Sequence, residues 1–276
     1  MRVLLTGAGG QLGLAVAHVF RRHEVVGRAH AALDVADAEA VEAALAEVRP
    51  ELVLNAAAYT AVDRAEDEPE AADRVNREGA RVLAVATARR GIPVLHVSTD
   101  YVFDGEKGAP YVESDATHPL GVYGASKLAG EEEVRRANPR HWIARTAWLY
   151  GPVGRNFATS IRAAAEREPK LRVVDDQWGS PTWAPHLAAA LERLLERAPG
   201  TYHLANAGVT SRFDFACALL AALGSATPVE PIPTSAWPTR ARRPRNTALA
   251  SERADAIALP DWREGVDEFA KTVSGA

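Results

Sequence analysis

Three side chains of this sequence are typical of acid–base chemistry at a carbonyl group: Thr99, Tyr123 and Lys127. Tyr123 and Lys127 stand four residues apart in a helical stretch, where four residues rotate a side chain by about 400°, so both project from one face. A carbonyl carbon that accepts hydride leaves negative charge on its oxygen, and the Tyr123 phenol would donate the proton. A Lys127 ammonium would stabilise the phenolate and lower its pKa from about 10. Thr99 would hydrogen-bond the substrate oxygen.

Each of these residues also has a structural interpretation, as a strand-end cap for Thr99 and a solvated helix face for Lys127. A Tyr and a Lys at this spacing also occur by chance on exposed helices. Here they accompany a hydroxyl-rich strand end at residues 98–99 and a glycine-rich turn near the start of the chain. The combination favours catalysis over the structural interpretations.

The glycine-rich turn reads Thr-Gly-Ala-Gly-Gly-Gln-Leu-Gly over residues 6–13 and directly follows the first predicted strand. Glycines at Gly7, Gly10 and Gly13 allow a tight turn and let backbone amides and the helix dipole approach a pyrophosphate. Any tight turn between strand and helix can use glycine, but this position favours a dinucleotide site. We therefore expect NADPH or NADH as the hydride donor.

The second predicted strand does not end in the acidic residue that would accept hydrogen bonds from a ribose diol; Arg28 and His30 lie there instead. A cation at this point accommodates a 2′-phosphate, which favours NADPH over NADH, although an exposed arginine also serves solubility. Asp34 would either approach the adenine from the next loop or cap the helix that begins near Asp37.

The first half of the chain alternates short β-type runs with longer helical patterns, which predicts a Rossmann-like, doubly wound α/β fold with a parallel sheet. The ligands of such a fold bind at the carboxyl ends of the strands. The predicted strands are Arg2 to Thr6, Glu24 to Gly27, Leu52 to Asn55, Val94 to Ser98 and Trp142 to Thr146. The main helical stretches between them are Ala38 to Val48 and Pro69 to Arg90.

After about residue 150 the pattern becomes irregular, with Pro- and Gly-rich turns. We expect a nucleotide-binding domain over residues 1–150 and a smaller, mainly substrate-binding domain over 151–276. The predicted elements of the second half are a strand at Thr201 to Leu204 and helices at Ala184 to Ala198 and Phe213 to Leu223. Some of these segments could return to the main sheet.

Composition excludes several classes of function. The net charge of −4 is spread over mixed acids and bases, with no polybasic block for nucleic acid or anionic lipid. The chain opens into the glycine turn too early for a signal peptide and has no run of about 18 apolar residues, so we expect a cytoplasmic protein. The lone Cys217 lies in an apolar helical run, where a buried thiol without a role is the simplest interpretation.

At the level of whole motifs the chain resembles the extended short-chain dehydrogenase/reductases, and within them the dTDP-4-dehydrorhamnose reductase family. The resemblance spans almost the whole sequence. It rests on residues 10–13 (Gly-Gln-Leu-Gly), 55–63, 98–105 (Ser-Thr-Asp-Tyr-Val-Phe-Asp-Gly), 123–131, 145–150, 176–182 and 243–247. It implies reduction of the C4 keto group of dTDP-6-deoxy-L-lyxo-4-hexulose to dTDP-L-rhamnose by NADPH or NADH.

The resemblance also implies roles for individual residues. Those that would line the cofactor site are Gly10, Gln11, Leu12, Asp34, Val35, Ala57, Ala58, Tyr59, Tyr123 and Lys127. Those that would meet the substrate are Thr99, Asp100, Trp148, Asn156 and Arg243. Arg243 belongs to a basic cluster with Arg240, Arg242 and Arg245, which would either bind the substrate diphosphate or form a solvated loop.

Two departures from the family pattern limit what the resemblance implies. Ala147 stands where a serine is more usual, and the helix after the glycine turn begins without the acid that would favour a Mg²⁺ site. Metal dependence is therefore doubtful, and no metal ligand is assigned; a homodimer is known in the family, but the sequence shows no dimer face. The alternatives are reduction of another nucleotide-linked 4-keto sugar, or a non-catalytic NADP-binding regulatory subunit like the methionine adenosyltransferase beta subunit.

Overall fold

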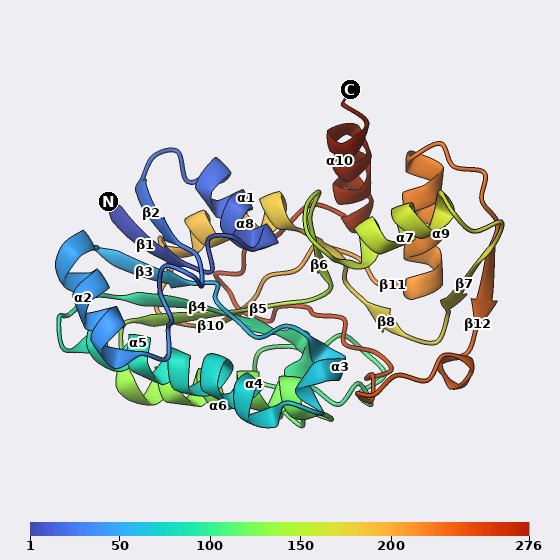
Figure 1. Cartoon of the computed structure of the whole chain (residues 1–276). Helices are drawn as coiled ribbons and strands as arrows, with labels where there is room; N and C mark the ends of the chain where they lie inside the picture. Colours follow the sequence, from blue (N-terminus) through green and yellow to red (C-terminus); the bar gives the residue numbers. More distant parts are fainter. Residues whose placement is uncertain (276) are drawn as a thin grey trace.

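A six-stranded parallel sheet forms the centre of the computed structural model, which describes residues 1–275 (Figure 1). Its strand order is β10-β5-β4-β3-β1-β2. The strands are β1 (Arg2–Thr6), β2 (Glu24–Arg28), β3 (Leu52–Asn55), β4 (Val94–Thr99), β5 (His141–Thr146) and β10 (Gly200–His203). The chain leaves β1 toward β2 and then returns to β3 on the other side, so the order reverses at β1. The predicted doubly wound α/β fold is confirmed, with its reversal point beside the glycine turn.

Helices cover both faces of this sheet (Figure 1). One face carries α1 (Gln11–Val19) and α8 (Ala184–Leu194), and the other carries α2 (Ala38–Val48), α5 (Gly79–Ala88) and α6 (Val122–Ala137). Because both faces are covered, the inner strands are buried along nearly their whole length, as in β3, which is apolar up to its last residue. Each layer forms its own buried core, so the carboxyl edge of the sheet is held rigidly from both sides.

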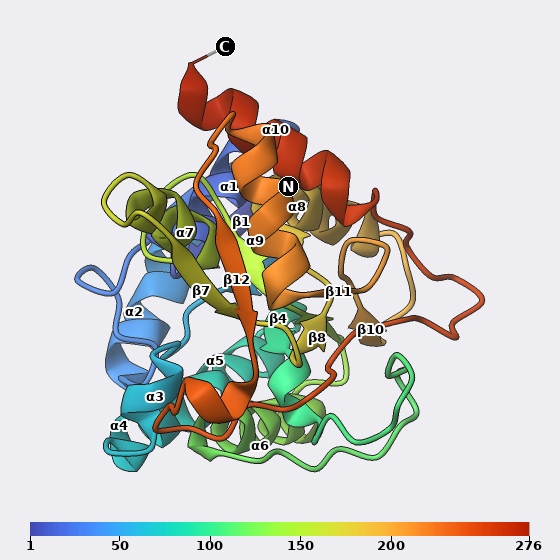
Figure 2. The same cartoon turned by 90° about the vertical axis from the view of Figure 1, so that its right-hand side faces the viewer.

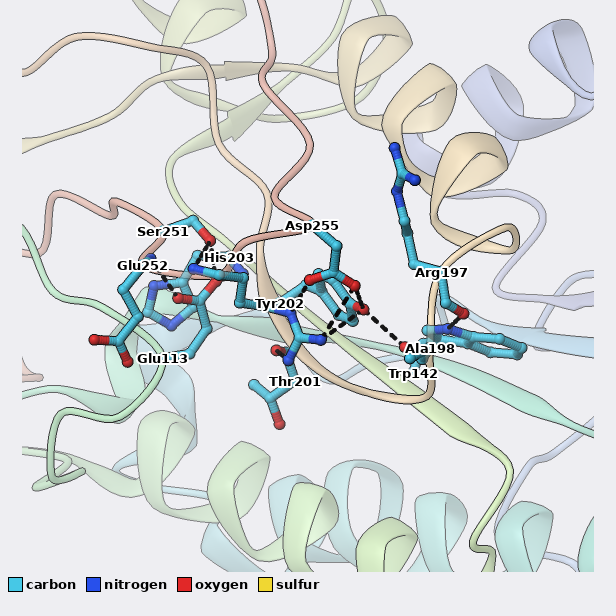
Figure 3. A network of polar contacts seen from close by, with 11 residues as sticks. Glu113, Trp142, Arg197, Ala198, Thr201, Tyr202, His203, Ser251, Glu252 and Asp255 are labelled. Atoms are coloured by element: carbon cyan, nitrogen blue, oxygen red, sulfur yellow. Dashed lines mark hydrogen bonds and ion pairs between the residues drawn. The ribbon is translucent and has the colours of Figure 1, made fainter.

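Two elements from the second half of the chain belong to the main sheet. The predicted strand at Thr201 to Leu204 forms as β10 and pairs in parallel with β5, while α8 packs against α1. Figure 3 shows how the segment near Asp255 is tied to β10: the Tyr202 hydroxyl donates to Asp255, and Arg253 donates to the same hydroxyl at 2.8 Å. The layered domain is therefore not contiguous in sequence.

The remaining elements build a second, smaller unit beside the carboxyl edge of the sheet (Figure 2). They are β6 (Leu149–Tyr150), α7 (Phe157–Ala165), β7 (Leu171–Val174), β8 (Trp178–Gly179), β9 (Thr182–Trp183), β11 (Thr210–Ser211), α9 (Arg212–Ala222), β12 (Val229–Ile232), a 3₁₀ turn at Thr234–Ala236 and α10 (Trp262–Ser274). Its strands pair only in twos. An aromatic cluster that includes Tyr150, Phe215 and Phe269 fills its centre.

The helix predicted from Pro69 to Arg90 is interrupted. It forms as α4 (Pro69–Asp73), a π-helical turn at Arg74–Glu78 and α5. The buried Asn76 lies in that turn, accepts a hydrogen bond from the Tyr59 amide at 2.8 Å and donates to the Ser126 hydroxyl at 3.0 Å. The wider turn thus joins the loop after β3, which contains the short helix α3 (Val62–Ala65), to the helix that carries the predicted catalytic pair.

No helix within residues 1–275 is both long enough and apolar enough to span a bilayer.

Candidate active site

A cavity of about 1290 Å³ lies between the carboxyl edge of the sheet and the second unit. It is lined by segments that follow β1, β3 and β4 and by the second unit. The predicted cofactor residues in its wall are Gly7, Gly10, Gln11, Leu12, Gly13, Asp34, Val35, Ala57, Ala58, Tyr59, Tyr123 and Lys127. The predicted substrate residues in its wall are Thr99, Asp100, Trp148, Asn156 and Arg243. Arg28 alone among the candidates is not part of this wall.

The glycine turn leaves no room for side chains. Gly7 has a φ of +69°, and a Cβ there would lie 2.6 Å from the Ala56 backbone. A Cβ on Gly13 would lie 2.4 Å from the Gly7 carbonyl oxygen. Bare backbone amides therefore meet the cavity where α1 begins, which fits the pyrophosphate of a dinucleotide.

The end of β2 differs from the expectation for Arg28. The Arg28 guanidinium donates to Glu47 at 2.7 Å, away from the cavity. His30, by contrast, lines the cavity. Asp34 accepts a hydrogen bond from Arg74 at 2.5 Å, which lowers the pKa of that carboxyl. The helix cap is Asp37, which accepts hydrogen bonds from two amides of α2, so capping is not the task of Asp34.

Lys127 is buried at 2% exposure, and its ammonium donates to the Val97 carbonyl oxygen at 2.6 Å. His96 Nε2 lies 3.4 Å from the same nitrogen. Burial lowers the pKa of Lys127 to about 8 and that of His96 far below its usual range, so the imidazole is neutral. The Val97 carbonyl oxygen accepts from one of the three ammonium donors. His96 Nδ1 accepts from the Asn55 side-chain amide, so the imidazole proton is on Nε2 and this atom is not an acceptor for Lys127. Donors of the ammonium therefore remain for a ligand.

Tyr123 differs from the expectation in one respect. Burial raises the pKa of its phenol, a hydrogen bond with Thr99 opposes this, and Lys127 does not contribute. The ammonium is directed toward Val97 rather than toward the phenol. Tyr123 is consequently held as a neutral phenol, the form that donates a proton.

Thr99 and Asp100 form a short hydrogen-bond chain at the end of β4. The Thr99 hydroxyl donates to Asp100 Oδ1 at 3.0 Å, and Thr247 from the far end of the sequence donates to Oδ2 at 2.5 Å. Burial raises the pKa of Asp100 to about 6, while the Thr247 and Thr99 hydroxyls lower it. The carboxylate thereby orients the Thr99 hydroxyl near Tyr123, and Thr247 fixes the carboxylate.

The opposite wall centres on Trp148. Its backbone has a left-handed φ of +45°, a strained conformation for an aromatic residue. Its indole lies so close to Gly179 that a Cβ there would be 2.4 Å away. The Arg212 guanidinium stacks on the indole, 3.5 Å from the ring centroid. The ring that the resemblance assigns to the sugar is therefore held in place by Gly179 and Arg212.

The two other substrate candidates have structural partners as well. Asn156 caps α7 through a capping box and donates to the Gln11 side chain at 3.2 Å, linking the second unit to the glycine turn. Arg243 donates to Asp63 at 2.6 Å through Nη2, while its buried Nη1 has no partner within residues 1–275. Of the predicted basic cluster only Arg243 lines the cavity.

Sequence reasoning missed four residues at this site: His96, Arg212, Trp237 and Thr247. His96 could have been found, because it lies on the same strand as Thr99. The other three come from segments more than 100 residues away from Thr99. Thr247 lies in the 243–247 segment that carries part of the resemblance, whereas nothing in the local sequence marks Arg212 or Trp237.

In the part of the chain that the structure describes, no group of three or more His, Cys, Asp or Glu side chains is arranged to hold a metal ion.

Comparison with known proteins gives a consistent result. Residues 1–274 match the model of the family described as RmlD substrate binding domain. A Burkholderia thailandensis protein named dTDP-4-dehydrorhamnose reductase is 43% identical, with 96% of this chain and 97% of that protein covered. The crystal structure of a dTDP-4-dehydrorhamnose reductase from Clostridium acetobutylicum superimposes with a TM-score of 0.96 at 35% identity, covering 99% of this chain and all of that one. The Bacillus anthracis enzyme of the same name, solved in complex with NADP, gives 0.94 at 34% identity over 97% of this chain and 98% of that one.

Proposed function

This chain belongs to the dTDP-4-dehydrorhamnose reductase family, and from that premise we propose that it reduces the C4 keto group of dTDP-6-deoxy-L-lyxo-4-hexulose to give dTDP-L-rhamnose. The observation that carries the proposal is that Thr99, Tyr123 and Lys127 line the same cavity as a glycine turn in which Gly7 and Gly13 leave no room for a side chain. A dinucleotide site and a proton donor thus face one space.

The proton comes from Tyr123. When bound, a reduced nicotinamide supplies the hydride that the keto carbon accepts. The negative charge that develops on the substrate oxygen is met by the phenol, which burial keeps protonated at neutral pH. Thr99 lines the same cavity and would position the substrate oxygen beside the phenol once its hydroxyl turns from Asp100.

Lys127 contributes to cofactor binding and to the charge of the site. Its free donor is directed into the cavity and would bind the ribose next to the nicotinamide. The positive charge of Lys127 does not shift the pKa of the Tyr123 phenol in this structure, so its part in the reaction is to bind the cofactor rather than to tune the acid. The Val97 carbonyl oxygen fixes the position of the ammonium.

For the cofactor we propose NADPH in preference to NADH. Within residues 1–275 no acidic side chain at the end of β2 lines the cavity; Asp34, from the next loop, is engaged by Arg74. His30 contributes to the wall and would lie near a 2′-phosphate. Arg28, paired with Glu47, would have to leave that partner to take part.

The test is oxidation of NADPH and of NADH by the purified protein with enzymatically prepared dTDP-6-deoxy-L-lyxo-4-hexulose, with the product sugar identified by NMR. Turnover to dTDP-L-rhamnose, faster with NADPH at subsaturating concentration, is the expected result. Cofactor binding without turnover on this sugar, but with turnover on another nucleotide-linked 4-keto sugar, would move the assignment to that substrate. Cofactor binding without turnover on any of them would favour the regulatory alternative.

A further inference from the structure

The Arg212 guanidinium carries a positive charge in the cavity, and none of the roles described above involves this charge. It is the first residue of α9, directly after the cap Ser211, and its side chain lines the cavity wall. The guanidinium stacks on the Trp148 indole and lies 5.0 Å from the Phe157 ring centroid. Stacking fixes its plane and leaves its N–H edge free to donate.

The charge of Arg212 has no ion-pair partner. Among residues 1–275 no carboxylate lies within 4.0 Å of it, whereas Arg243 across the cavity is paired with Asp63. The acid that influences it is Asp100, whose two oxygens already accept from Thr99 and Thr247. Tyr101 is a hydrogen-bond partner of Arg212, but it does not neutralise the charge, and a half-buried guanidinium without a carboxylate partner is costly. Arg212 is therefore a strong site for an anion.

The surroundings of Arg212 indicate which kind of anion it binds. Burial lowers the pKa of Arg212, Tyr101 and Asp100 raise it, and Arg243 lowers it, so the guanidinium lies within electrostatic reach of both the catalytic end and Arg243. Arg243 also presents a buried Nη1 without a partner. The Arg212 and Arg243 side chains thus line the same cavity, and Arg212 contacts Trp148.

We propose that Arg212 binds the phosphate that carries the hexose in the nucleotide-sugar substrate, with Arg243 as the second cation of the same diphosphate site. The inference rests on the proposed function only in taking a nucleoside-diphosphate sugar as the ligand. The Trp148 ring between the sugar and Arg212 couples the two contacts: the indole packs against the hexose, and the arginine on its far side binds the adjoining phosphate.

The experiment compares how tightly dTDP, dTMP and thymidine bind, by calorimetry in the presence of NADP⁺. The terminal phosphate of dTDP is the one that bears the sugar in the substrate, so the dTDP-to-dTMP affinity ratio isolates the contact. We expect Arg212→Met, which keeps an apolar chain over Trp148 but removes the charge, to lower that ratio about tenfold or more. Thymidine binding should stay within about twofold, because it carries no phosphate.

Arg242→Gln is the matched control, since it removes the same charge from an exposed position outside the cavity wall. It should leave the ratio unchanged. Arg212→Lys should restore part of the ratio, because it returns a cation without the planar fork. NADP⁺ affinity reports that each variant is folded; if Arg212→Met does not bind NADP⁺, the Arg212→Lys and Arg212→Gln variants carry the test.

An unchanged dTDP-to-dTMP ratio in folded Arg212 variants would overturn the inference. So would an equal loss for thymidine, dTMP and dTDP, because that pattern belongs to a residue that only supports Trp148. Neither result depends on turnover. An enzyme that fails to reduce the hexulose but shows an Arg212-dependent ratio would retain the phosphate site and lose the proposed reaction.

Discussion

The two walls of the cavity are built in different ways. The core of the cofactor wall is a local segment, the turn over residues 7–13, in which close packing of the backbone excludes a side chain at Gly7 and Gly13. The substrate wall gathers side chains from four distant places, including Trp148, Arg212 and Arg243. Substitutions that add atoms should therefore weaken binding at the cofactor wall, whereas substitutions that remove atoms should weaken binding at the substrate wall.

The largest effect is expected where the walls meet, at the proton donor. Tyr123→Phe should lower kcat by about a thousandfold, because the phenol is the acid, while the Kd for NADPH stays within about twofold. Stopped-flow reduction and cofactor titration measure the two quantities. Tyr101→Phe is the control, as its ring lies 5.6 Å from that of Tyr123 in the same cavity. Near-normal turnover by Tyr123→Phe would exclude it as the acid.

A single methyl group tests the cofactor wall. Gly13→Ala places a Cβ 2.4 Å from the Gly7 carbonyl oxygen, an overpacking that costs about 1–3 kcal/mol and should raise the Kd for NADPH about ten- to a hundredfold. Gly9→Ala is the control, because its Cβ would meet only the Ala29 methyl at 3.5 Å. Equal affinities in the two variants would contradict the claim that the turn works by excluding side chains.

The pH dependence of kcat/KM tests the positive charge of Lys127, which lies between the two walls. Because burial lowers the pKa of Lys127 to about 8, the ammonium is present below that pH and is lost above it. We expect kcat/KM to fall about tenfold per pH unit above 8, since this parameter follows the groups of the free enzyme. Lys127→Arg should be slower but should lack this decline, because a guanidinium stays charged. A decline that persists in Lys127→Arg would assign it to another group.

The smallest effect is expected at the outer edge of the substrate wall. Asp63 accepts from the Ala241 amide at 3.1 Å and from Arg243, and thereby fixes the segment after β12 to α3. Asp63→Asn should raise KM for the nucleotide sugar about threefold, the size expected for a partly exposed ion pair. Asp67→Asn, which frees only the exposed Arg240, should not change KM. Initial rates at two salt concentrations measure both.

The same contrast explains what could be predicted from the sequence. The sheet, its flanking helices and the glycine turn follow from local patterns, and the strand limits differ from those predicted by only one residue or so. The role of Arg28 was not foreseen, because its partner Glu47 lies on a helix whose distance from β2 no local pattern gives. The π-helical turn at Asn76 was not predicted for a similar reason, because the hydrogen bonds of Asn76 with Tyr59 and Ser126 exist only in the folded protein.

The substrate wall was predicted only where the resemblance supplied residues. Trp148 and Arg243 were named in that way. Thr247 stands in the same 243–247 segment without having been given a role, whereas Arg212 stands in a segment without a motif. Their positions depend on how α9 and the closing segment pack against β4, and this packing is set by tertiary contacts rather than by periodicity. Local patterns therefore predict the chemistry better than they predict the substrate.

The return of β10 and α8 to the main sheet has a consequence for how the molecule is made. During synthesis the edge strand beside β5 is missing until residue 203 has left the ribosome, and the face that α8 covers stays open for as long. A nascent chain of residues 1–150 therefore exposes an apolar layer and a bare strand edge, both prone to aggregation. A chimera with a relative should accordingly take β10 and α8 from the same parent protein as the first 150 residues.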